Sequence, residues 1–249
     1  MRILENAKKK EEDKQTPLHY AVKYIEDVAE LLINHGANVS AEDTNNQTPL
    51  HVAAYYGHKV VELLINHGAN VSARDIDNET ALHLAVKRSY DSADRYYVVQ
   101  TLINQGADVN TINNRKWTPL HEAVESGERD LAELLLNHGA SVNAETIYKN
   151  TPLHLAADWG NMDIVKLLIN HGANLNAKDR ENRTPLVRAR EMGEKEVFQF
   201  LLPLTLEASD AVRISPFFGK RILYSIILIY TIALINNSEH THKINQCFT

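Results

Sequence analysis

Short apolar stretches occur in pairs along most of the chain, and a polar segment follows each pair. The stretch HLAADWG precedes IVKLLINHGAN, for example, and HVAAYYG precedes VVELLINHGAN. Each stretch is long enough for about two or three helical turns, and isolated helices of that length are marginal in water. The pattern therefore predicts two short helices and a turn, repeated, with neighbouring units stacked to bury their apolar faces.

A tetrapeptide marks the start of each predicted first helix, with spacings of 32, 32, 38, 33 and 33 residues. It reads TPLH at Thr16, Thr48, Thr118 and Thr151, TALH at Thr80 and TPLV at Thr184. The threonine hydroxyl can accept a hydrogen bond from the first helical turn, and proline suits the first helical position. The second helix ends at the glycine of NHG, which can adopt the left-handed conformation of a C-cap.

The 33 residues from Thr151 to Arg183 resemble an ankyrin repeat along their whole length, and the pattern recurs six times. The resemblance implies an all-α solenoid of helix-turn-helix units with short β-hairpin loops. A lead-in or partial cap at 1–15 precedes the first repeat. The six repeats are placed at residues 16–47, 48–79, 80–117, 118–150, 151–183 and 184–202.

The chain departs from the ankyrin pattern in several ways, the first being that repeats one and two lack one residue between their helices. Ankyrin hairpins usually have glycine two residues before the threonine, where φ is often positive, and asparagine tolerates that region better than lysine. This chain has Asn46, Asn78, Lys116, Lys149 and Asn182 there. Repeat three also carries five extra residues within 87–100, which are either a tolerated surface insertion or a local functional element.

Histidine is frequent, with twelve copies, but most copies recur at two fixed positions of the repeat. The resemblance implies that the histidine of TPLH is a structural hydrogen-bonding residue. A histidine before the capping glycine suits the negative end of a helix. No catalytic motif is present, and one weak metal-like constellation remains at His240, His242 and Cys247. We therefore predict a protein that is not an enzyme, without a metal site or cofactor.

Ankyrin domains usually bind protein partners through the hairpin tips and the first helices, which line the concave face. Aromatic and basic residues, which are common in binding hot spots, occupy several of those positions. We predict a partner-binding set of Tyr55, Tyr56, Lys87, Arg88, Trp117, Tyr148 and Trp159. The five aromatic residues are placed to form one strip, and the alternative is that they merely pack against neighbouring repeats.

The sequence carries 26 Lys and Arg against 32 Asp and Glu, a net charge of −6. That balance gives no electrostatic attraction to nucleic acid. The single cysteine excludes a disulfide framework, and the first residues lack the apolar run of a secretory signal peptide. We predict a monomeric, cytoplasmic scaffold that binds a protein partner. The alternative is an adaptor or effector that recruits a host or cellular target to a larger machine.

The C-terminal segment differs in composition from the repeats. We expect Pro203 to end the last helix, with a linker at 203–221 and a polar tail at 236–249. Residues 222–235 carry no charge, and an α-helix of this length rises about 21 Å, less than the ~30 Å hydrocarbon core. Three roles stay open for them: a short membrane anchor that leaves the repeats facing the cytoplasm, a cover for repeat six, and an incidental tail.

Overall fold

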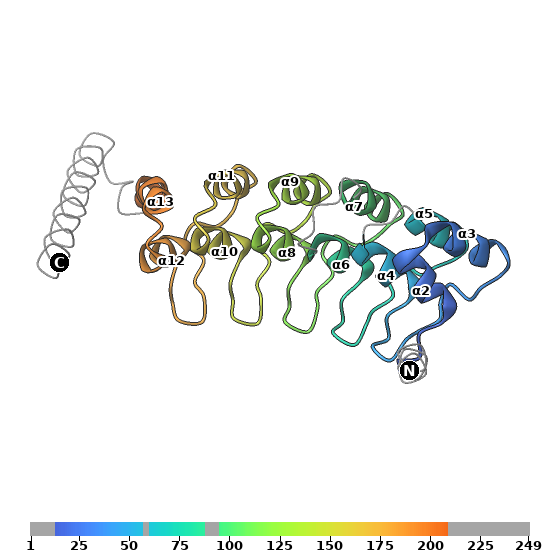
Figure 1. The fold of residues 1–249 in the computed structure, drawn as a ribbon. Helices are drawn as coiled ribbons and strands as arrows, with labels where there is room; N and C mark the ends of the chain where they lie inside the picture. The colour runs from blue at the N-terminus through green and yellow to red at the C-terminus, as the bar shows by residue number, and fades with distance from the viewer. Residues whose placement is uncertain (1–12, 57–59, 88–94, 209–249) are drawn as a thin grey trace, which may run out of the picture.

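The computed structural model describes residues 13–56, 60–87 and 95–208, which form twelve helices in six consecutive pairs. The first helices are α2 (Pro17–Tyr24), α4 (Pro49–Tyr56), α6 (Ala81–Lys87), α8 (Pro119–Glu125), α10 (Pro152–Asp158) and α12 (Pro185–Met192). The second helices are α3 (Glu26–Asn34), α5 (Val60–Asn66), α7 (Arg95–Asn104), α9 (Arg129–Asn137), α11 (Met162–Asn170) and α13 (Lys195–Ala208). Each set forms one row of an elongated solenoid (Figure 1). The predicted all-α repeat architecture is confirmed.

The start of each first helix follows the chemistry of the tetrapeptide. In repeat four, the backbone N–H of His121 donates to Thr118 Oγ1 at 3.4 Å, and the backbone N–H of Thr118 donates to His121 Nδ1 at 3.2 Å. This reciprocal pair is a capping box, and Pro119 follows as the first helical residue. The other ring nitrogen, Nε2, donates to the carbonyl of Asn150 at 3.2 Å. The histidine therefore ties its own helix to the hairpin that follows α9, which confirms its predicted structural role.

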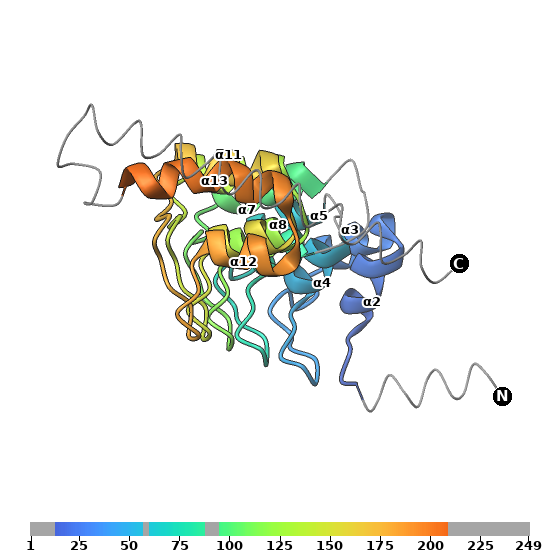
Figure 2. The same ribbon diagram turned by 90° about the vertical axis from the view of Figure 1, so that its left-hand side faces the viewer.

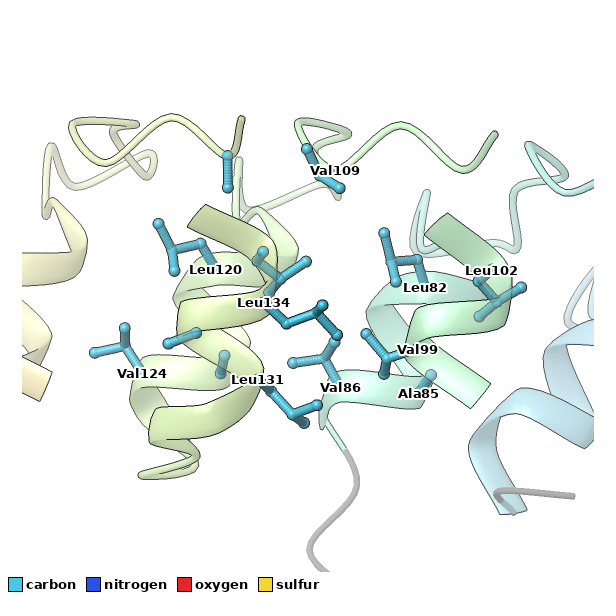
Figure 3. Packing of buried hydrophobic residues seen from close by; sticks show 14 of the residues in the cluster. Leu82, Ala85, Val86, Val99, Leu102, Val109, Leu120, Val124, Leu131 and Leu134 are labelled. Atoms are coloured by element: carbon cyan, nitrogen blue, oxygen red, sulfur yellow. The ribbon is translucent and has the colours of Figure 1, made fainter. Parts of the chain in front are cut away.

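The core lies between the two rows of helices and between neighbouring pairs (Figure 3). Leu82 of α6, Leu102 of α7 and Leu120 of α8 are completely buried in this one cluster. Ala85 and Ala123, also completely buried, are small enough to let the first helices of neighbouring repeats approach closely. Each repeat thus completes the burial of the next, as expected for helices too short to be stable alone.

Hairpin loops connect each pair to the next, and adjacent loops are joined backbone to backbone. In repeat two, the N–H of Asp75 donates to the carbonyl of Glu79 at 3.0 Å. The carboxylate of Asp75 accepts from the N–H groups of Asp77 and Glu79. The N–H of Ile76 donates to the carbonyl of Asn45 in the preceding loop at 2.9 Å. No strand is assigned within the described ranges, so turns and single cross-links hold these loops together.

The predicted positive φ angles are confirmed. They are 57°, 61°, 56°, 59° and 59° at Asn46, Asn78, Lys116, Lys149 and Asn182. A sixth, 51°, occurs at Lys14, two residues before Thr16. The carbonyl of Asp13 accepts from the N–H of Thr44 at 3.1 Å, as Asn45 does from Ile76 one repeat later. Residues 13–15 therefore form the end of a hairpin of the same kind, ahead of repeat one.

The prediction that Pro203 ends the last helix is wrong, because α13 continues through it to Ala208. Leu201 is completely buried and Thr205, one turn later, is also buried. The hydroxyl of Thr205 donates to the carbonyl of Leu202 at 2.9 Å. Proline removes one backbone hydrogen bond from a helix interior, and burial on both sides of Pro203 outweighs that loss.

Part of the predictions falls on segments outside the described residues. These are Arg88, most of the insertion (88–94), residues 222–235, and the constellation of His240, His242 and Cys247. The membrane anchor, in particular, stays a prediction. Within the described ranges, none of the helices has both the length and the apolar character needed to cross a membrane.

Candidate partner-binding surface

The hairpin loops and the first helices lie on one side of the solenoid, which we call the inner surface. The loops extend below the row of first helices and away from the second helices (Figure 1), and the view along the stack agrees (Figure 2). The predicted binding residues that the structure describes all come from these elements. Tyr55, Tyr56 and Lys87 end α4 and α6, Trp117 and Tyr148 lie in loops, and Trp159 caps α10.

Repeats one and two contribute a cluster of four tyrosines. The rings of Tyr20 and Tyr24 are 4.7 Å apart, and those of Tyr55 and Tyr56 are 5.1 Å apart and nearly perpendicular. Lys23 Nζ lies 5.0 Å from the ring centroids of both Tyr24 and Tyr56, so it joins the two pairs. Side-chain hydrogen bonds to Tyr56 and then to Tyr24 raise the pKa of Lys23 above its usual value. The predicted set contained only Tyr55 and Tyr56 of this cluster.

Repeats four and five contribute the two most exposed of the predicted aromatic residues. Trp159 is 61% exposed and Tyr148 is 56% exposed. The indole Nε1 of Trp159 donates to Glu125 Oε2 on the neighbouring helix α8 at 3.0 Å. The guanidinium carbon of Arg180 lies 5.7 Å from the centroid of the Tyr148 ring. Contacts with adjacent repeats therefore hold both rings in place while much of their surface stays exposed.

Trp117 is partly buried against the core and differs from these two residues. Its ring lies 5.9 Å from the imidazole of His121, and the Arg115 guanidinium lies 4.9 Å from its centroid. Here the two alternatives of the sequence analysis both apply, since the ring packs against the neighbouring repeat four and also borders the inner surface.

The aromatic residues form two groups and not the predicted single strip. Helix α6 lies between the tyrosine cluster of repeats one and two and the group around Trp117, and its one exposed side chain is Lys87. Lys87 Nζ donates to both carboxylate oxygens of Glu79, at 3.0 and 3.3 Å. Asn113 Nδ2 donates to the same carboxylate at 3.1 Å. A polar junction therefore separates the two aromatic groups.

This junction borders a small pocket of about 270 Å³. Its lining is polar and comes from two hairpins and the end of α6: Asp77, Glu79, Lys87, Asn113, Asn114 and Arg115. Glu79 is buried, whereas Lys87 and Arg115 are 40% and 53% exposed along their side chains. The pocket is thus walled by charged groups of both signs.

Glu122 on α8 is the functional candidate that sequence reasoning missed. Its side chain is 4% exposed, and its Oε1 has no hydrogen-bond partner among the described residues. Arg115 Nη2 is 3.9 Å away, beyond hydrogen-bond distance. Burial raises the pKa of Glu122 from its usual 4.5 to about 7, with Glu79 and Glu125 raising it further and Lys87 and Arg115 opposing.

The buried histidines have the opposite character. Burial lowers the pKa values of His51, His83 and His154, and it lowers that of His121 to about 4. Neutral rings suit their hydrogen bonds, because Nδ1 accepts from the threonine N–H while Nε2 donates to a carbonyl. Across the described ranges, no group of three or more His, Cys, Asp or Glu is arranged to hold a metal ion.

Comparison with known proteins gives one clear match. A family model described as ankyrin repeats, in three copies, matches residues 2–75, 73–146 and 143–211. No curated protein matches the chain. The matched residues include every described helix and the hairpin end at 13–15.

Proposed function

Because the chain belongs to the ankyrin repeat family, whose repeats are protein-interaction scaffolds, we propose that it binds a protein partner on its inner surface. The partner contacts the exposed aromatic residues of the first helices and hairpins, and the second helices serve as the supporting layer. The protein performs no chemistry on its partner.

The observation that carries this proposal is the arrangement of Trp159. A large indole ring that is 61% exposed offers apolar area that a partner can cover, and tryptophan is enriched among binding hot spots. Its hydrogen bond to Glu125 holds the ring in position before binding. Less side-chain freedom is then lost on association, which lowers the entropic cost of binding.

Substitution of this ring tests the proposal. Full-length protein and its Trp159→Ala variant are each used to capture partners from a cell extract, and the affinity of the captured protein for each is then measured. We expect a loss of at least tenfold in affinity for Trp159→Ala, because a central aromatic contact is removed. The thermal midpoint should stay nearly unchanged, because the ring packs little into the core.

Tyr96→Ala provides the matched control, since Tyr96 is an exposed aromatic residue on α7, a second helix. This variant should bind as the original protein does. Equal affinity of all three proteins, or an effect of Tyr96→Ala alone, would contradict the assignment of the inner surface.

A further inference from the structure

One position of the repeat can be compared across the whole molecule, namely the residue that follows the tetrapeptide. Its six occupants are Tyr20, Val52, Leu84, Glu122, Leu155 and Arg188. Val52, Leu84 and Leu155 are buried aliphatic residues, as expected for a position between neighbouring first helices. Only repeats four and six place a charged residue there.

In repeat six, the charge of Arg188 is paired with two carboxylates. Arg188 Nε donates to Asp158 Oδ1 at 2.8 Å, Nη2 donates to the second oxygen of the same carboxylate, and Nη1 lies 3.6 Å from Asp179 Oδ2. Glu122 occupies the equivalent position in repeat four, yet among the described residues its Oε1 accepts no hydrogen bond and has only a long ion-pair contact, 3.9 Å from Arg115 Nη2. The same scaffold position therefore carries a hydrogen-bonded charge in one repeat and, in another, a carboxyl oxygen without a hydrogen bond among the described residues.

A structural role does not account for Glu122. A buried polar atom without a partner is destabilising, and a leucine, as in repeats three and five, would avoid that penalty. A residue that lowers stability where an apolar one fits is expected at functional positions. The open oxygen therefore indicates a group supplied by a ligand.

The charged neighbours of Glu122 indicate which kind of ligand group can bind to its Oε1. Two carboxylates, Glu79 and Glu125, and two cations, Lys87 and Arg115, act on Glu122. Lys87 is hydrogen-bonded to Glu79, and the Arg115 guanidinium lies over the ring of Trp117. Neither cation therefore donates a hydrogen bond to Glu122.

An incoming anion would meet three carboxyl groups, and an apolar group would leave Oε1 unpaired. A cationic donor would satisfy Oε1, and charge-assisted hydrogen bonds are the strong ones. Aromatic faces also attract cations. Trp117 precedes α8, and Trp159 is bonded to Glu125, one helical turn beyond Glu122. Arg115, which is half exposed, is able to move aside and admit the donor.

We propose that Glu122 receives a lysine or arginine side chain of the partner at the junction of repeats three and four. This inference rests on the proposed function of the inner surface and adds the partner chemistry that this surface selects. Glu122 is then the specificity-determining residue, and the tryptophans supply apolar contact area beside it.

Binding of a cation should be linked to proton release. With a pKa of about 7, roughly a tenth of the Glu122 carboxyl is ionised at pH 6 and roughly nine tenths at pH 8. Only the ionised form offers the full charge to the partner, so the affinity should rise about tenfold between these two pH values.

The test uses random twelve-residue peptides displayed on phage and selected on the full-length protein. Peptides whose binding is lost with Trp159→Ala are kept, because these occupy the inner surface. We expect them to contain lysine or arginine and to bind Glu122→Gln at least tenfold more weakly. Their affinity should rise about tenfold from pH 6 to pH 8 with the original protein and stay constant with Glu122→Gln.

Glu133→Gln is the matched control, since Glu133 is a partly exposed glutamate on α9, a second helix, where it is ion-paired with Arg129. The selected peptides should bind this variant as tightly as they bind the original protein. Inner-surface peptides that bind Glu122→Gln as well as the original protein would overturn this inference and leave the proposed function standing. Peptides that bind independently of Trp159 and of every other aromatic residue of the inner surface would overturn both.

A titration with N-acetyl-arginine amide, followed by the carboxyl-carbon NMR signal of Glu122, gives a second readout that needs no selected peptide. The signal should shift with the arginine compound at pH 8 and not with N-acetyl-norleucine amide. Identical responses to the two compounds would also overturn the inference.

Discussion

Glu122 and His121 are neighbours on α8, and burial shifts their pKa values in opposite directions. The usual 4.5 of Glu122 rises to about 7, and the usual 6.5 of His121 falls to about 4. In both cases the neutral form is favoured, because burial penalises the charge. The folded protein therefore holds a proton on Glu122 and none on His121 over much of the range between pH 4.5 and 6.5.

Both shifts lower the free energy of unfolding, but they act in opposite directions of pH. As pH rises from 4.5 to 7, the unfolded chain loses the Glu122 proton before the folded protein does, so this residue lowers the free energy of unfolding. As pH falls from 6.5 to 4, the unfolded chain gains the His121 proton first, which also lowers it. In Glu122→Gln the contribution of Glu122 is removed, and the effects of His121 and the other buried histidines remain. The free energy of unfolding of this variant should then rise with pH more steeply, by about 1.4 kcal/mol per pH unit.

Urea denaturation of both proteins at several pH values measures this difference. Above pH 7 the variant should be the more stable by on the order of 3 kcal/mol, because it avoids the cost of burying the Glu122 charge. Parallel profiles for the two proteins would mean that the pKa of Glu122 is not raised.

Lys149 makes a second prediction at the scale of one residue. Its φ of 59° is unfavourable for a side chain with Cβ, and glycine has no such penalty. Lys149→Gly should therefore raise the free energy of unfolding by about 1 kcal/mol, measured from the urea midpoint. Asn182→Gly, at the same φ, should gain less because asparagine tolerates this region. Equal or opposite changes would contradict the strain at Lys149.

The roles of single residues were predictable where their partners are local. The histidine of the tetrapeptide bonds to a threonine three residues earlier, and the positive φ angles follow from the turn itself. Glu122 was not predictable, because the environment of its carboxyl group depends on where Glu79, Lys87 and Arg115 lie. Those residues come from other segments of the chain. Lys87 is hydrogen-bonded to Glu79, and the Arg115 guanidinium lies over the ring of Trp117.

At the scale of elements, the helix pairs and their caps follow the sequence, and α13 does not. Proline is disfavoured within a helix for local reasons, which made Pro203 a predicted end. Burial of Leu201 and Thr205 on the two sides of it is a tertiary effect. The local preference of proline does not take that burial into account. The prediction from sequence therefore placed the end of the last helix too early.

Two substitutions test this account of α13. Pro203→Ala should raise the thermal midpoint, because it restores a backbone donor, and the gain in free energy of unfolding can reach about 3 kcal/mol. Leu201→Ala should lower the free energy of unfolding by about 2–5 kcal/mol, because it opens a cavity in the core. A neutral Leu201→Ala would mean that the end of α13 does not depend on this burial.

At the scale of the whole molecule, the solenoid was predictable because each repeat contacts only its neighbours. The inner surface was predictable only in part. Tyr55, Tyr56, Trp117, Tyr148 and Trp159 all come from its elements, but the polar end of α6 divides them into two groups. That division arises where Lys87, Glu79 and Asn113 meet, and these residues come from repeats two and three.

The central claim is that the partner covers the inner surface. Hydrogen–deuterium exchange of the full-length protein, with and without a bound partner or selected peptide, tests it most directly. We predict slower exchange in the hairpin loops and at the C-terminal ends of α8 and α10, with no change in α9 and α11. Protection confined to the second helices would contradict the claim.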